Sequence, residues 1–299
     1  AMKFPGAPWG LKMACGENPK RVYGGKGTAP ATRMGNVAGY RAAFIDASEY
    51  LRKNAPKDSA PPKRRWWQSA NGNGADSEKD TGGKRDLKLD TLAGAINGDI
   101  LVHIHCYRAD EMATMLDLAN EFGFKVAAFH HGVEAYKLAD RLAADGVCGA
   151  LWADWWGFKM EAFDGIQENV ALVDRPANGC AIVHSDSDEG IQRLNQEAAK
   201  VIANARRAGL DIAPERAIRW ITSNAAKSMG ILEQTGTLEA GKMADVVLWS
   251  GNPFSVYAKA EQVYVDGARV FDRADPARQP RSDFMLGQGP ASGATGGVR

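Results

Sequence analysis

The stretch Lys125-Val126-Ala127-Ala128-Phe129-His130-His131 is a short apolar run that ends in side chains able to bind a metal ion. Short runs that are apolar on both faces are typical of strands buried in a parallel sheet. Three other segments have the same form and carry a potential ligand at their ends: 9–14 with Lys12, 100–106 with His105, and 180–186 with Asp186. Together with the apolar run at 148–152, they predict five buried strands.

Segments with helical periodicity separate these strands. Helices are predicted at 32–53, 87–96, 109–122, 134–144, 194–208 and 213–229. Strands and helices that alternate favour a parallel sheet, and (β/α)8 enzymes keep their chemistry at the carboxyl ends of such strands. We therefore predict an α/β fold of the (β/α)8 TIM-barrel type, with the liganding residues at one mouth of the barrel.

Composition divides the chain into three parts. They are predicted to be 1–231 as the barrel portion, 232–274 as a β-sandwich portion and 275–299 as a tail. The segment 54–84 contains many Pro and Gly and few aliphatic residues, which predicts a mobile insertion or a lid. A shorter loop is predicted at 15–21. Short β segments at 246–249 and 262–271 are the basis for the β-sandwich.

Composition also narrows the classes of partner. The chain has 299 residues, 24% of them charged, and a net charge of +1, so neither nucleic acid nor membrane is an expected partner. No apolar run approaches the ~18 residues that span a bilayer. The basic and aromatic stretch 63–67 could stack on nucleic acid, but packing of its two Trp residues on the barrel or a neighbouring subunit is favoured. The first residues lack the apolar core of a signal peptide, so the sequence carries no targeting information. The cytoplasm is slightly favoured, and the periplasm is possible because an N-terminal part of the protein is expected to be missing.

The four cysteines are scattered along the chain. Cys15, Cys106, Cys148 and Cys180 do not form the paired spacing of a zinc knuckle, and three of them lie within or beside apolar runs. We therefore expect reduced, buried cysteines that act as small apolar side chains, in place of a disulfide framework.

Several motifs resemble, in this order, those of the amidohydrolase superfamily, specifically its imidazolonepropionase-like branch. The motifs are Gly10–Ala14, His105 with Arg108–Glu111, His131-Gly132, His184–Ser187, Asn224–Ile231 and Gly236–Val247. The last of these, with the pattern Gly-x-Leu-x-x-Gly-Lys-x-Ala-Asp, is the most specific. The resemblance covers nearly the whole chain apart from the insertion and the tail.

The resemblance implies a divalent metal site, most simply one or two Zn²⁺ ions, at the ends of barrel strands four, five, six and eight. The implied ligands are Lys12, His105, His131 and Asp186. A lysine ammonium offers only donors, so Lys12 could ligate a metal only as the carbamate formed with carbon dioxide. The imidazoles would be neutral ligands, and Asp186 would bind metal and act as general base toward a metal-bound water.

The implied reaction is hydrolysis of a C–N bond in a small molecule: a cyclic amide, a dipeptide-like compound or an acyl-amino acid. His184 would orient the Asp186 carboxylate as a second catalytic residue. Tyr107, Glu17 and Asn18 follow the ends of their strands and are candidates for contact with the substrate, although packing of the loops explains them equally well.

Simpler interpretations of the ligand set remain open. Lys12 could extend its ammonium to the barrel rim, and each histidine could be a core residue with satisfied hydrogen bonds. His103 is expected on the same face of its strand as His105, whereas His130 is expected on the opposite face from the site.

One part of the family pattern is absent. The His-x-His pair of strand one should precede the Lys12 strand, but only eleven residues do so, and strands one to three are absent as well. We expect a fragment or one half of the enzyme, completed by a second chain or by a homo-oligomer. The alternative is a catalytically silent subunit or assembly partner that retains the ligands.

Overall fold

The computed structural model describes residues 3–54 and 85–278. Two compact units are separated between Thr237 and Leu238, and each is described by itself. Nearly all of the predicted insertion and most of the predicted tail, at 55–84 and 279–299, lie outside the described residues.

The first unit is built on a five-stranded parallel sheet. Its strands are β1 (Trp9–Ala14), β2 (Ile100–His105), β3 (Val126–His130), β4 (Cys148–Leu151) and β5 (Ala181–Val183). They lie side by side in chain order, and every neighbouring pair is parallel. Val102, Ile104 and Phe129 are completely buried, as expected for strands covered on both faces. The predicted α/β class and the five predicted strands are therefore confirmed.

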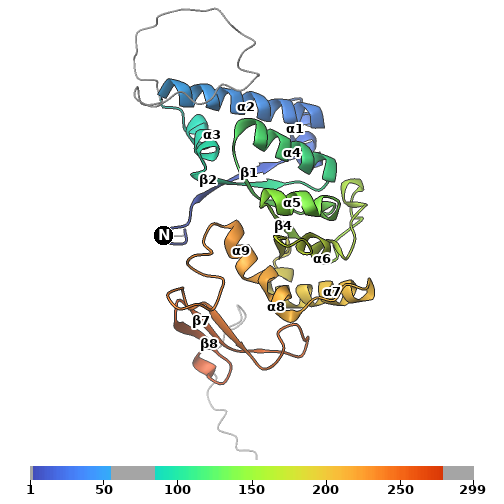
Figure 1. Ribbon diagram of the computed structural model, residues 1–299, viewed down its shortest axis with the longest axis vertical. Coiled ribbons are helices and arrows are strands. Elements are labelled where there is room, and N and C mark those ends of the chain that lie inside the picture. Colours follow the sequence, from blue (N-terminus) through green and yellow to red (C-terminus); the bar gives the residue numbers. More distant parts are fainter. Residues whose placement is uncertain (1–2, 55–84, 279–299) are drawn as a thin grey trace, which may run out of the picture. The chain divides into compact units, whose positions relative to one another are not determined.

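Helices connect the strands and follow one another beside the sheet (Figure 1). The long ones are α2 (Arg33–Asn54), α3 (Leu87–Asn97), α4 (Ala109–Phe122) and α7 (Leu194–Arg207). Asp86 caps α3 by accepting hydrogen bonds from the backbone N–H groups of Lys88 and Leu89. Gly123 ends α4 with a φ of 88°, a conformation that glycine adopts without steric cost. In residues 3–54 and 85–278, none of the helices is long and apolar enough to cross a membrane.

Short helical turns depart from the predictions. The segment 15–21 was predicted as a loop, but it contains the start of α1 (Glu17–Gly24). The helix predicted at 134–144 is divided into η2 (Ala135–Leu138) and α5 (Ala139–Asp145). The helix predicted at 213–229 is divided into α8 (Pro214–Ala217), η5 (Ile218–Ile221) and α9 (Ser223–Ser228). The remaining short elements are η3 (Met160–Ala162), α6 (Asn169–Asp174) and η4 (Gly190–Arg193).

The prediction of reduced cysteines was wrong, because all four are paired. Cys15, just after β1, is bonded to Cys106, just after β2, with Cα atoms 5.2 Å apart. Cys148, at the start of β4, is bonded to Cys180, just before β5, with Cα atoms 4.6 Å apart. Neighbouring strands lie about 4.8 Å apart, so cysteines at matching positions on adjacent strands meet the distance that a disulfide requires.

The second unit contains a three-stranded antiparallel sheet. Its strands are β6 (Val246–Trp249), β7 (Ala260–Val265) and β8 (Ala268–Asp272), in that order, and η6 (Pro276–Arg278) follows them. Asp266 and Gly267 join β7 to β8 with φ angles of 50° and 77°. Positive φ at both central residues is the requirement of a two-residue type I′ hairpin. The β segments predicted at 246–249 and 262–271 are confirmed.

Candidate metal and catalytic site

All five histidines of the chain lie at the carboxyl end of the parallel sheet. His103 and His105 are on β2, His130 is the last residue of β3, His131 follows it, and His184 follows β5. In a parallel sheet the carboxyl ends of all strands meet at one edge. Histidines from three different strand ends, from His103 to His184, are therefore brought to one place.

The histidines form two close pairs. Nδ1 of His103 is 3.0 Å from Nε2 of His130, and Nδ1 of His131 is 3.2 Å from Nε2 of His184. Asp186 lies beside the second pair, with Oδ2 3.5 Å from His131 Nδ1 and Oδ1 3.9 Å from His184 Nδ1. One ligand atom from each of His131, His184 and Asp186 lies within 4.8 Å of the others. This group could hold one metal ion.

The backbone at His131 explains why two consecutive histidines point to the same site. His130 is the last strand residue, and its partner across the sheet is His105. His131 has a φ of 61°, which is uncommon for a residue other than glycine. Its ring centroid is 5.9 Å from that of His130. The expectation that His130 faces away from the site is therefore wrong, because strand alternation ends where His131 takes a left-handed conformation.

Lys12 lies deeper in the sheet than predicted. The β1 strand continues to Ala14, and Lys12 pairs with His103 in the parallel register. Its charge contributes to lowering the pKa of all five histidines. Desolvation lowers the pKa of the Lys12 ammonium itself, and the nearby Asp186 carboxylate opposes this effect. Lys12 therefore lies within electrostatic range of the whole cluster.

Burial keeps the histidines uncharged at neutral pH. It is the main cause that lowers the pKa of His105 to about 4, of His130 to about 3, of His131 to about 2 and of His184 to about 4. Burial also raises the pKa of Asp186, while the positive charge of Lys12 opposes that rise. Neutral imidazoles have a free lone pair for a metal, so the cluster has the electrostatic state that a metal site requires.

His105 is contacted by a residue predicted to bind substrate. Asn18, on α1, places Nδ2 3.0 Å from His105 Nε2, and its Oδ1 accepts a hydrogen bond of 3.2 Å from Lys159 Nζ. A lysine ammonium only donates, so the amide oxygen of Asn18 faces Lys159 and its NH₂ group faces the imidazole. Asn18 therefore contacts the His105 ring at Nε2, and the role of that nitrogen in the contact depends on the tautomer of the ring.

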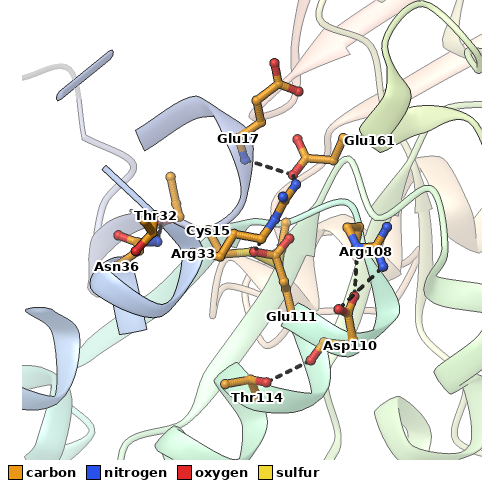
Figure 2. A network of polar contacts seen from close by, with 12 residues as sticks. Cys15, Glu17, Thr32, Arg33, Asn36, Arg108, Asp110, Glu111, Thr114 and Glu161 are labelled. Carbon is orange, nitrogen blue, oxygen red and sulfur yellow. Dashed lines mark hydrogen bonds and ion pairs between the residues drawn. A yellow bond between two sulfur atoms is a disulfide. The ribbon is translucent and has the colours of Figure 1, made fainter. Parts of the chain in front are cut away.

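Tyr107 and Glu17, the other two residues predicted to contact the substrate, have different surroundings. The buried Tyr107 ring is 4.8 Å from the His105 ring and 6.1 Å from the His131 ring. Burial raises the pKa of its hydroxyl, which stays protonated. Glu17 donates its backbone N–H to Glu161 Oε1 at 2.8 Å, while Figure 2 shows its carboxylate directed away from Glu161.

Sequence reasoning missed a network of charged residues beside this cluster (Figure 2). Arg33 on α2 is 3.2 Å from Glu111 on α4 and 3.0 Å from Glu161 on η3. The Glu161 side chain is 1% exposed, and its Oε2 atom is 3.5 Å from Lys159 Nζ. The four residues come from three separate parts of the chain, so no spacing in the sequence could have indicated the network.

The donor set suits a divalent transition metal. Imidazole nitrogen and carboxylate oxygen are ordinary ligands of Zn²⁺, and a site of this kind needs no thiolate. His105, Tyr107 and Trp152 all lie next to His131, and the Trp152 ring is stacked on the His131 ring at a centroid distance of 4.9 Å. The residues present therefore fit the metal that the motifs imply.

Comparison with known proteins identifies the family. A family model described as the amidohydrolase family matches residues 194–271, which include the motifs at 224–231 and 236–247. Amidohydrolase tasK of Hapsidospora irregularis is 32% identical over 266 residues, covering 88% of this chain and 26% of that protein. The crystal structure of an amidohydrolase from Thermotoga maritima MSB8 matches with a TM-score of 0.71 and 30% identity. The family model, the relatives and the structure together support an amidohydrolase superfamily member.

The tasK and Thermotoga maritima matches cover most of this chain but a smaller share of each relative's own length. The match covers 88% of this chain and 63% of the Thermotoga maritima chain. Imidazolonepropionase of Agrobacterium fabrum is 44% identical over 62 residues, which are 19% of this chain and 14% of that enzyme. This chain spans 26% of the length of tasK. Amidohydrolases generally bind a divalent metal, and the His131, His184 and Asp186 group is present here.

Proposed function

We propose that this amidohydrolase chain forms much of the active site of a metal-dependent hydrolase that cleaves a C–N bond in a small molecule. The substrate classes proposed are cyclic amides, dipeptide-like compounds and acyl-amino acids. One observation carries the proposal: five neutral histidines, Lys12 and Asp186 converge at the carboxyl end of a parallel sheet. Hydrolases with (β/α)8 folds place their catalytic residues at that end.

We propose that β1 to β5 correspond to strands four to eight of a (β/α)8 barrel. The similarity to the Thermotoga maritima amidohydrolase supports this assignment, since 88% of the chain is matched. The three strands β6 to β8 would then be part of a small β-sandwich. Because the chain matches 63% of that amidohydrolase, the remaining strands of the barrel would come from residues outside this sequence.

The proposed metal ligands are His105, His131, Asp186 and a carbamate on Lys12, with Zn²⁺ as the proposed ion. When bound, the cation supplies Lewis-acid polarisation of the substrate carbonyl and lowers the pKa of water toward neutrality. A carbamate forms when the neutral Lys12 amine adds to carbon dioxide and loses a proton. The lowered pKa of Lys12 increases the fraction of amine available for this reaction.

Asp186 is the proposed general base. Its carboxylate would take a proton from the attacking water and pass it to the leaving nitrogen, and desolvation raises its pKa in the direction that helps it accept the proton. His184 lies next to both Asp186 and His131 and would hold these two groups in place, or ligate the metal itself. Tyr107 and Asn18 border His105 and would contact the substrate.

A second candidate function is a catalytically silent subunit or assembly partner. It is favoured by the position of β1, which is an edge strand of the parallel sheet, with Trp9 67% exposed. An unpaired strand edge is a surface to which another chain can add. In this case the ligands would be retained, but turnover would require residues from a partner chain.

Metal analysis combined with intact-protein mass measurement would test the main proposal. The chain, purified after growth with Zn²⁺, should contain one or two equivalents of metal and show the mass of one carbon dioxide on Lys12. Lys12→Met should abolish the mass increase, whereas Lys20→Met, on α1, should keep it. A folded chain that remains metal-free when dialysed against Zn²⁺ would contradict the proposed site.

A further inference from the structure

The loop after β4 exposes a group of large apolar side chains close to the histidines. Trp155 is 39% exposed and Phe158 is 55% exposed. The further members of this group are Trp156, Met160 and Phe163. Single exposed apolar residues are common, but several exposed apolar residues within one loop indicate a binding surface.

Trp152 connects this loop to the metal group through stacked rings. Its ring lies 4.9 Å from the His131 ring at an interplanar angle of 28°, and 5.1 Å from the Trp155 ring at 29°. Phe158 meets the edge of the same Trp152 ring at 5.6 Å and of Tyr107 at 6.3 Å. The aromatic surface is therefore continuous from the proposed reaction centre to the exposed loop.

The indole N–H of Trp152 is a buried donor without an acceptor. The residue is 6% exposed, and within the described part of the chain its Nε1 atom has no hydrogen-bond partner. Buried polar groups in folded proteins are almost always paired. An acceptor on a bound molecule, such as the carbonyl oxygen of an amide, would accept the hydrogen bond that this N–H group can donate.

The loop is anchored along its length. Asp154 accepts a hydrogen bond of 3.0 Å from Lys200 on α7, and the backbone N–H of Gly157 bonds to the carbonyl of Ala162 at 2.9 Å. Lys159 contacts Asn18 on α1 and Glu161 on η3. Residues anchored in this way can present a preformed wall, which lowers the entropic cost of binding.

We propose that Trp152, Trp155 and Phe158 form a subsite for an apolar, preferentially aromatic, group on one side of the scissile amide. The inference rests on the proposed function, because that function places the amide at the histidines. An aromatic ring is the preferred occupant, since it can stack on Trp155 while Phe158 contacts its edge. The Trp152 N–H would donate a hydrogen bond to the carbonyl oxygen of that amide.

The test measures binding of two probes by calorimetry, with the full chain and Zn²⁺ present. The probes are N-acetylglycine and N-(3-phenylpropanoyl)glycine, which share the amide and differ by an aromatic group. The aromatic probe should bind about threefold to tenfold more tightly. Trp155→Ala and Phe158→Ala should each reduce this preference. Trp9→Ala is the control, because it removes an exposed Trp at the amino end of β1, away from the histidines, and it should leave the preference unchanged. Trp152→Phe keeps a ring but removes the N–H, so it should weaken both probes.

Three outcomes would overturn the subsite. They are equal affinity for the two probes, no measurable binding of either, and a dimer that Trp155→Ala dissociates, which would make the wall an interface between copies. Failure of the proposed function gives a different result: neither amide would be hydrolysed while the preference for the aromatic probe persisted. Hydrolysis of both amides at equal rates with equal binding would retain the function and reject the subsite.

Discussion

The Nδ1 atom of His131 lies 3.2 Å from the Nε2 atom of His184, although 53 positions separate the two residues in the sequence. Two neutral imidazoles at this distance can share one proton between their nitrogens, and the remaining nitrogen of each ring is available to another partner. Asp186 lies within 4 Å of both rings. The three residues therefore act as one unit, and a change in any of them should affect the others.

Replacing the two histidines should separate a metal ligand from a positioning residue. His131→Ala removes a proposed ligand and should weaken Zn²⁺ binding more than about 100-fold. If His184 only orients its neighbours, His184→Ala should weaken binding about 10-fold to 100-fold, as is usual for residues that support metal ligands. Competition with a chromogenic chelator measures both. Equal losses in the two variants would indicate that His184 is itself a ligand.

Stability should fall as the pH is lowered from about 6.5 to about 4. The folded-state pKa values of His105, His130, His131 and His184 are depressed to about 4 or below, whereas the unfolded values are near 6.5. Between these values the unfolded chain binds more protons, so acid favours unfolding, by at most about 1.4 kcal/mol per pH unit for each histidine. The raised pKa of Asp186 acts in the opposite direction.

Urea unfolding at several pH values measures this dependence in the metal-free chain. His103→Phe and His130→Phe together should flatten the curve, because they remove two of the groups that must charge. A midpoint that stays constant from pH 7 to pH 4.5 would contradict the buried, neutral state of the cluster.

Arg33→Met should destabilise the fold strongly. Glu161 is almost completely buried, and Glu111 also depends on Arg33 for its ion pair. Loss of the cation leaves two carboxylates in a poorly solvated place, which costs about 3 kcal/mol. Arg41→Met is a matched control, because the Arg41 pair with Glu121 is more exposed and should contribute less than about 1 kcal/mol. Similar unfolding free energies for the two variants would show that the buried network contributes little.

Reduction of the disulfides should lower the unfolding free energy. The Cys148–Cys180 bond closes a loop of 32 positions, and a bond of this kind stabilises by about 3 to 4 kcal/mol in the chain-entropy model. Cys148→Ser with Cys180→Ser should therefore unfold at lower urea concentration. Reductant should shift the wild-type midpoint and leave a variant with all four cysteines replaced unchanged. Four titratable thiols in the unfolded, unreduced protein would refute the pairing.

The disulfides also bear on the compartment. Disulfides persist in oxidising environments and are rare in the cytosol. On this ground we propose an oxidising compartment, such as the periplasm, in place of the cytoplasm that the sequence alone slightly favoured.

Local pattern was sufficient to predict much of this protein. Each buried strand is a short apolar run, and the helix at 109–122 has its stop signal at Gly123, so both could be predicted from residues close together in the chain. The motifs at 224–231 and 236–247 were sufficient to indicate the superfamily. Lys12, His105, His131 and Asp186 could be predicted as candidate ligands because each lies in or just after an apolar run.

Only the tertiary structure decided which further residues lie beside these candidate ligands and which cysteines pair. The order of the strands brings Cys148 to Cys180 and His103 to His130, and neither pair has a signal in the sequence. The φ of His131 places two consecutive histidines in one site, against the alternation of a strand. The physical reason is that strand and helix propensities depend on neighbours along the chain, whereas these contacts depend on sheet register and on backbone conformation where a strand ends.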